Sequence, residues 1–138
     1  MHQEMDEISI NTRGQGCYEV TREVGNWLKQ TGCNKGLLTV FNRHTSASLT
    51  IQENADSDVQ LDLTDALDRL APVSAPYRHI CEGPDDMPAH VKAALTSTGL
   101  TIPVMNGQMT LGTWQGIYLL EHRDQPHIRR LVLHFLGA

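Results

Sequence analysis

The segment spanning residues 44–51 constrains the fold most, because its side chains alternate between two chemical kinds. Successive side chains of an extended chain point to opposite faces of a sheet. One face would carry Ala47, Leu49 and Ile51, and the other His44, Ser46, Ser48 and Thr50. We therefore expect a strand that packs its apolar face on a core and presents hydroxyls and an imidazole to a cavity.

The rest of the chain alternates strand and helix patterns, without an internal repeat or a long linker. Helical spacing and helix-end signals predict helices within 21–32, 56–72 and 85–99, the last burying Val91, Ala94 and Leu95. Besides 44–51, strands are expected at 7–10, 36–41, 100–105, 108–111, 114–123 and 128–136, with a hairpin turn at Asn106-Gly107. The prediction is one α+β domain over residues 1–138, with about seven strands and three helices.

Composition narrows the class of protein. Eleven Lys and Arg against 16 Asp and Glu give a formal charge of -5, which argues against a nucleic-acid binder. No apolar run approaches the roughly 18 residues of a membrane span, and the acidic N-terminus does not resemble a signal peptide. Three widely spaced cysteines, Cys17, Cys33 and Cys81, indicate free thiols in a reducing compartment. We expect a cytoplasmic protein with a small-molecule substrate and no membrane partner.

Seven histidines are many for this length, and three of them stand among polar residues. His44 begins the alternating strand, His90 follows Asp-Asp-Met-Pro-Ala, and His122 lies in Glu-His-Arg. Imidazole is the commonest neutral ligand for zinc-like ions, and three protein ligands with one open position are typical of a catalytic site. The alternative is that each is a separately hydrogen-bonded or surface histidine, because their spacing alone does not make them converge.

Carboxylates accompany these histidines. Glu53 ends the alternating strand, and Glu82, Asp85 and Asp86 surround the start of the third helix. Neighbouring acids can act as general acid or base, or orient a metal-bound histidine, so Asp86, Glu53 and Asp85 are the catalytic candidates. The alternative for one of the two aspartates is a helix cap.

Two glycines bracket Thr113, Trp114 and Gln115, in a place where glycine would weaken a regular strand. A ligand that approaches the backbone closely would explain them. Trp114 could then stack on a flat ring, and Gln115 could donate an amide hydrogen bond. The alternative is a β-bulge with a half-buried Trp114.

Three motifs together resemble the YjbQ family, also called secondary thiamine-phosphate synthases. They are HTSASL at 44–49 with Glu53-Asn54, HICEGPDDMPAH at 79–90, and GTWQGIYLLEHR at 112–123. Their order and spacing extend the resemblance over essentially the whole chain. It implies a bifurcated β-sandwich, a homotrimer, and convergence of His44, His90 and His122 on a metal ion, with zinc expected. The candidates for substrate contacts are Ser46, Ser48, Asn54, His79, Glu82, Trp114, Gln115 and Arg123.

Three functions follow from these expectations. The first is weak transfer chemistry like that of thiamine-phosphate synthase, on a phosphorylated or pyrophosphorylated small metabolite. A metal ion and Arg123 would then face the phosphates, although adjacent residues of a regular strand point to opposite faces, so Arg123 and His122 should diverge. The second is a metal-dependent hydrolase, in which Asp86 or Glu53 takes a proton from a metal-bound water. The third is a protein that only binds a metal or ligand.

Overall fold

The computed structural model describes residues 1–138 and contains eight strands and three helices. The helices are α1 (Thr21–Thr31), α2 (Asp58–Leu70) and α3 (Asp86–Leu95). The strands are β1 (His2–Asn11), β2 (Gly16–Glu19), β3 (Gly36–Asn42), β4 (Ala47–Glu53), β5 (Gly99–Met105), β6 (Gln108–Met109), β7 (Gln115–Glu121) and β8 (Ile128–Gly137). The predicted α+β class is confirmed.

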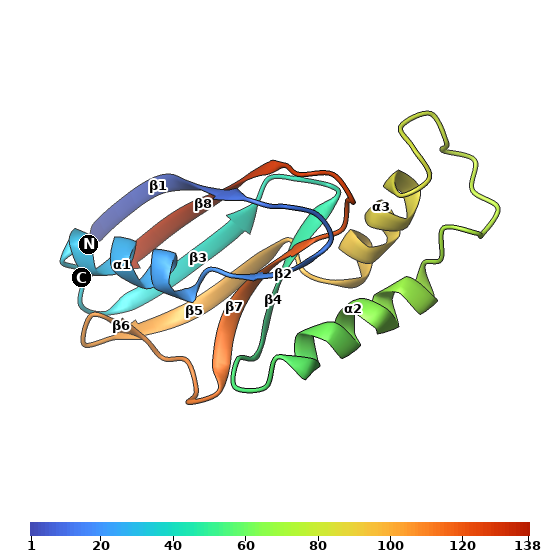
Figure 1. The fold of residues 1–138 in the computed structure, drawn as a ribbon. Coiled ribbons are helices and arrows are strands. Elements are labelled where there is room, and N and C mark those ends of the chain that lie inside the picture. Colours follow the sequence, from blue (N-terminus) through green and yellow to red (C-terminus); the bar gives the residue numbers. More distant parts are fainter.

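The strands form two antiparallel sheets (Figure 1), in the orders β1-β8-β3-β5-β6 and β2-β7-β4. The hairpin predicted at Asn106-Gly107 joins β5 to β6, and both turn residues have positive φ. The strand that sequence reasoning missed is β2, which has only four residues. It exists because it pairs with β7, with Cys17 opposite Leu120, and such a long-range pairing leaves no local pattern.

A cluster of 16 buried apolar residues forms the core, with members from both sheets and from α1. Ala47 and Leu49 of β4 are fully buried in it, as the alternating pattern predicts. The polar face of the same strand is also covered at Ser48, which is only 1% exposed. The Ser48 hydroxyl accepts a hydrogen bond from Thr96, just after α3, at 2.5 Å. The expectation that this face opens to a cavity is therefore wrong at Ser48, because the end of α3 packs on it.

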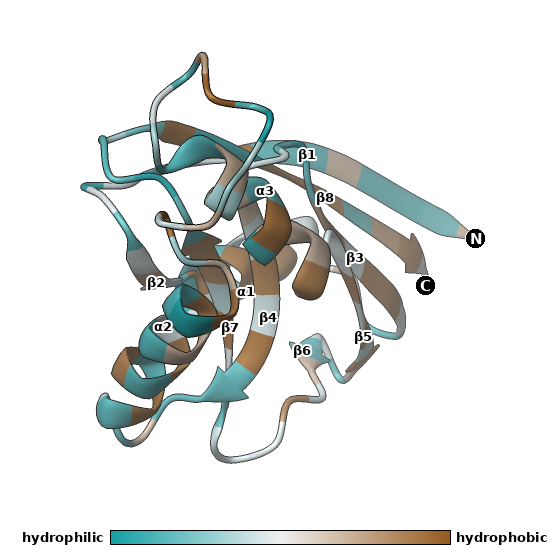
Figure 2. Cartoon of the chain, turned by 90° about the vertical axis from the view of Figure 1, so that its right-hand side faces the viewer, coloured by the Kyte–Doolittle hydropathy of each residue, from teal (hydrophilic) through white to brown (hydrophobic).

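Helices α2 and α3 lie outside the core and form an outer layer, which faces the viewer in Figure 2. No residue of α2 is fully buried. The buried residues of α3 are Asp86, Pro88, Ala89 and Lys92. The predicted inward face of Val91, Ala94 and Leu95 is wrong, since Leu95 is 57% exposed.

Polar pairing explains this orientation of α3. The ammonium group of Lys92 lies 2.6 Å from an Asp68 carboxylate oxygen of α2, and Asp86 begins the cluster described below. A buried charge needs a partner more than a leucine needs full burial. None of the three helices combines the length and the apolar character that a bilayer crossing requires.

Candidate metal centre

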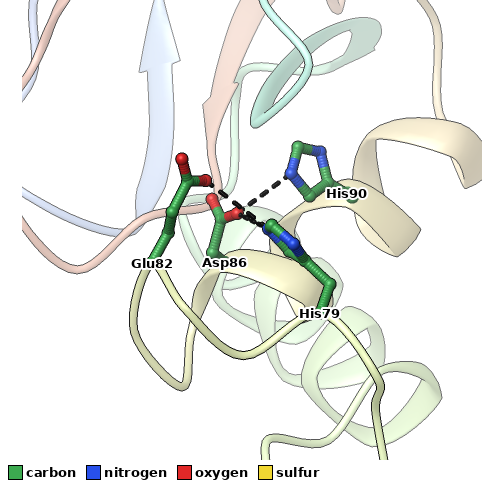
Figure 3. A group of neighbouring side chains, drawn as sticks. All are labelled: His79, Glu82, Asp86 and His90. Carbon is green, nitrogen blue, oxygen red and sulfur yellow. Dashed lines mark hydrogen bonds and ion pairs between the residues drawn. The ribbon is translucent and has the colours of Figure 1, made fainter.

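Four side chains with metal-binding atoms meet at the start of α3: His79, Glu82, Asp86 and His90 (Figure 3). One ligand atom from each lies within 4.8 Å of the ligand atoms of the other three. Asp86 and His90 are one helical turn apart, so they share a face of α3. His79 and Glu82 come from the loop that joins α2 to α3 at the edge of the molecule (Figure 1). This turn-plus-helix arrangement explains the spacing of the motif at 79–90.

The centre of the cluster is a single oxygen atom, Oδ2 of Asp86. Nε2 of His79 lies 2.6 Å from it, and Nε2 of His90 lies 3.0 Å from it. Glu82 is more distant, with Oε2 at 3.5 Å from the His79 Nε2 atom. Asp86 is 2% exposed, whereas Glu82 is exposed. The cluster therefore has a buried carboxylate at its base and an open side at Glu82.

The contacts of the two ring nitrogens of His90 show that Nε2 is the atom directed at the cluster. Nδ1 lies 2.9 Å from the backbone carbonyl oxygen of Thr45, and Nε2 faces Asp86. Both neighbours are acceptors, but a neutral imidazole has only one N–H group. A metal ion in place of a proton on Nε2 would satisfy both contacts. An outer carbonyl that fixes the tautomer is typical of metal-binding histidines.

Arg123 holds the cluster from the side of the sheet. Its guanidinium group donates from Nε to Asp85 at 2.9 Å, from Nη1 to Asp86 at 2.7 Å and from Nη2 to the Glu82 carbonyl oxygen at 2.9 Å. Asp85 occupies the N-cap position of α3 but makes no side-chain capping bond. The capping alternative for Asp85 is therefore wrong, because its carboxylate binds Arg123 and the backbone N–H of Asp124.

Charges in this network separate the pKa values of its members. The hydrogen bond to Asp86 raises the pKa of His79 above its ordinary value. Burial by itself would raise the pKa of Asp86, but the hydrogen bond from His79 and the nearby His90 and Arg123 lower it. Asp86 is therefore an anion at neutral pH, as a metal ligand must be.

The other two histidines of the predicted triad lie outside this cluster. His122 is 4% exposed and its Nε2 lies 2.8 Å from the Ser48 hydroxyl oxygen. Burial and the charge of Lys92 lower the pKa of His122 to about 4. Nε2 of His44 accepts a hydrogen bond from the backbone N–H of Arg130 at 2.8 Å. His44 does share a cavity of about 350 Å³ with His90, but Asp86 does not line that cavity.

A second group of predicted residues lies at the opposite end of the β4–β7 pair. In this ladder Ala47 pairs with Glu121 and Glu53 pairs with Gln115. Six residues of strand separate the two ends, which is roughly 20 Å. Glu53, Asn54, Trp114 and Gln115 are therefore not brought to the cluster. Trp114 is 63% exposed, not half-buried, and the Gln115 side chain accepts a hydrogen bond from the Gly112 N–H.

A buried ion pair beside the cluster has no counterpart among the predicted site residues. Glu121 and Arg129 are 1% and 4% exposed, and Nε of Arg129 donates to Glu121 at 2.8 Å. Arg129 also donates to the hydroxyl of Ser46, and Thr12 donates to Glu121. Ser46 is thus engaged by the protein itself. Two local signals existed: Glu121 is a charged residue at the end of an apolar strand, and Arg129 alternates with the buried Leu131 in β8.

The fold and this cluster define a class: two antiparallel sheets with an outer helix that carries a histidine–carboxylate centre. The chain belongs to the family described as "UPF0047 protein YjbQ-like", which it matches over residues 6–138. It is 47% identical to UPF0047 protein sll1880 of Synechocystis over 99% of this chain and 92% of that protein. Identity to UPF0047 protein YjbQ of Escherichia coli is 40%, over 94% and 95% of the two chains.

Solved structures agree with this assignment. A YjbQ/UPF0047 family protein of Clostridium acetobutylicum superimposes with a TM-score of 0.88 at 36% identity, covering 95% of this chain and 99% of that one. A hypothetical protein of Aeropyrum pernix superimposes with a TM-score of 0.89 at 29% identity, covering 98% of this chain and 99% of that one. The family resemblance expected from the three motifs is confirmed.

Proposed function

We propose that this protein is a metal-dependent enzyme of small-molecule chemistry, in which His79, Asp86 and His90 bind one divalent ion. The observation that carries the proposal is the convergence of two Nε2 atoms on one buried carboxylate oxygen, at 2.6 and 3.0 Å. Zinc is the proposed ion, because two imidazoles and a carboxylate are an established zinc ligand set that leaves a position open.

Hydrolysis of a small substrate is the reaction that this arrangement supports best. A bound zinc ion would lower the pKa of a water molecule at the open position. Glu82 is exposed and its Oε2 lies 3.5 Å from Nε2 of His79, so its carboxylate would be able to accept a proton from a water molecule bound there. Asp86 supplies the buried negative charge, and Asp85 acts at a distance by holding Arg123.

Weak thiamine-phosphate synthase-like transfer is the second candidate. The observation that favours it is the position of Arg123, a cation directly against Asp86 at the edge of the cluster. Each guanidinium nitrogen already has a protein partner, so Arg123 can attract a phosphoryl group but can offer it only an N–H group that these bonds leave unused. We therefore expect slow turnover of a phosphorylated or pyrophosphorylated metabolite.

Assembly and location complete the proposal. We propose a homotrimer, supported by exposed apolar side chains on the outer face of the large sheet, among them Leu37, Phe41 and Leu136. A cytoplasmic location is supported by three free cysteines, Cys17, Cys33 and Cys81. Light scattering that gave a monomer mass at working concentrations would contradict the trimer.

The metal centre is tested by comparing two sets of variants in a calorimetric zinc titration of chelator-treated protein. His79→Ala and Asp86→Asn remove ligands of the observed cluster, and His44→Ala and His122→Ala remove the other members of the predicted triad. His90→Ala belongs to both sets and should lose zinc in either case. A direct ligand should cost more than the roughly 10–100-fold affinity loss that follows removal of a neighbouring partner.

The outcomes separate the two ligand sets. Loss of zinc binding in His79→Ala and Asp86→Asn, with zinc binding retained in His44→Ala and His122→Ala, supports the cluster. The reverse result supports the predicted triad. Thermal unfolding of each metal-free variant checks that the fold is intact. No saturable zinc binding by the unmodified protein would exclude the proposed zinc centre.

The reaction is tested with the same protein, with and without chelator and beside His90→Ala. Chromogenic esters and phosphoesters test hydrolysis, and the two thiamine precursors, a pyrimidine pyrophosphate and a thiazole phosphate, test transfer. Turnover that depends on both the metal and His90 identifies the reaction class. Retained zinc without any turnover favours the third function, a binding protein.

A further inference from the structure

Arg123 stands out in the cluster because each nitrogen of its guanidinium group has a protein partner. Its side chain is 18% exposed, and its fork touches Asp85, Asp86 and the carbonyl oxygen of Glu82. Its backbone N–H donates to Glu121 at 3.1 Å, and the backbone N–H of Asp124 donates to Asp85 at 2.9 Å. The guanidinium plane is thus fixed between the end of β7 and the start of α3.

The two oxygens of Asp86 consequently have different neighbours. Oδ1 accepts a hydrogen bond from Nη1 of Arg123 at 2.7 Å. Oδ2 faces the Nε2 atoms of His79 and His90. Arg123 thus holds Oδ1 towards the guanidinium group, and Oδ2 is the oxygen that the carboxylate directs at an ion between the two imidazoles.

We propose that Arg123 is a positioning residue that restricts Asp86 to one ligand oxygen and so sets which divalent ion the centre prefers. The inference rests on the metal centre proposed above. Zinc is satisfied by four ligands, with nitrogen and single carboxylate oxygens among them. Manganese favours more oxygen ligands, and calcium accepts a carboxylate through both oxygens. Arg123 therefore favours zinc by withholding Oδ1.

The positive charge of Arg123 has a second effect on metal affinity, which must be separated from the restriction of Asp86. Arg123 is positive, so its removal strengthens the attraction of every divalent ion to the site. That change acts on zinc and manganese alike, because it depends on ionic charge and not on coordination preference. Freeing Oδ1 acts mainly on manganese. The ratio of the two affinities is therefore the decisive quantity.

The anchor of Arg123 provides an independent way to test the same idea. Asp85 accepts from Nε of Arg123 but is not a member of the cluster. Asp85→Asn weakens the hold on the guanidinium group and leaves Arg123 in the chain. It should release Oδ1 for part of the time and shift the affinity ratio in the same direction, by less.

The experiment measures zinc and manganese dissociation constants by competition with a chromophoric chelator, for the full chain and three variants. Arg123→Met keeps length but has neither charge nor donors, and Asp85→Asn loosens the anchor. Arg130→Met is the matched control, since Arg130 is an exposed arginine whose side chain contacts Ser9 and Glu7. We expect the zinc-to-manganese affinity ratio to fall at least about tenfold in Arg123→Met and to stay unchanged in Arg130→Met.

The result that overturns the inference is a parallel shift of both affinities in Arg123→Met, which would reduce Arg123 to a charge effect. If that variant fails to fold in a thermal melt, Asp85→Asn decides, and an unchanged ratio there overturns the inference. Failure of the proposed metal centre gives a different result, in which the unmodified protein binds neither zinc nor manganese saturably. That result also overturns the inference about Arg123.

Discussion

The β4–β7 ladder carries motif residues at both ends, and the two ends differ in burial and connection. At one end Glu121 and His122 are buried, and Arg123 is tied into the cluster on α3. At the other end Trp114 is exposed, and the side chain of Gln115 bonds to the Gly112 N–H of its own turn. The first end is covered because α3 and the loop before it pack there. Motif membership therefore does not by itself place a residue in a site.

The largest expected effect comes from breaking the buried ion pair at the covered end. Glu121→Gln leaves the Arg129 charge without a partner, so we expect the free energy of unfolding at pH 7 to fall by about 3–5 kcal/mol. Urea denaturation measures this loss. The matched control is Glu53→Gln at the other end of the same strand pair. A loss in Glu121→Gln below about 1 kcal/mol would mean that the pair behaves as a surface salt bridge.

The pH dependence of stability sharpens the comparison. The folded state holds His122 neutral with a pKa of about 4, whereas an unfolded histidine has a pKa near 6.5. Acid therefore favours the unfolded chain, which binds a proton at His122 more readily. The contribution of neutral His122 to the stability of the folded state is complete above pH 6.5 and is lost as the pH falls towards 4. We compare the free energy of unfolding of the unmodified protein with that of His122→Asn. The difference between the two should change by about 3 kcal/mol between pH 6.5 and pH 4.

Denaturant titrations at several pH values check this expectation. A difference that stays constant between pH 6.5 and 4 would show that His122 titrates normally in the folded state. Glu121 contributes separately at lower pH. Burial would raise its pKa, but Arg129 and Thr12 lower it below its ordinary value, so its stabilising effect is lost only as the pH falls below that value.

The smallest effect is expected at the open end. Trp114→Ala removes an exposed side chain, so the free energy of unfolding should change by no more than about 0.5 kcal/mol, and zinc affinity should stay the same. Urea denaturation and the zinc titration measure both. A large loss of stability or of metal would show that Trp114 is covered or connected in a way that contradicts the comparison between the two ends.

Local patterns predicted the elements that depend on local causes. The alternation at 44–51 predicts β4, although that strand begins at Ala47 and leaves His44 and Ser46 before it. The Asn106-Gly107 dipeptide predicts the hairpin, because turn chemistry, like strand periodicity, is a property of neighbouring residues. His122 and Arg123 do diverge, since His122 contacts Ser48 and Arg123 contacts Asp85, but β7 ends at Glu121, before both residues, so the alternation of a regular strand is not the cause. The strand β2 did not follow, because only its partner β7 makes it a strand.

The sequence by itself determined the family, the α+β class and the presence of histidines and carboxylates among polar residues. Tertiary structure decided which of them meet: His79 joins Asp86 and His90, whereas His44 and His122 bind Arg130 and Ser48. It also decided that α3 turns Asp86 and Lys92 inward and Leu95 outward. The physical reason is that partners for buried charges come from distant segments, and no local pattern records which segments pack together.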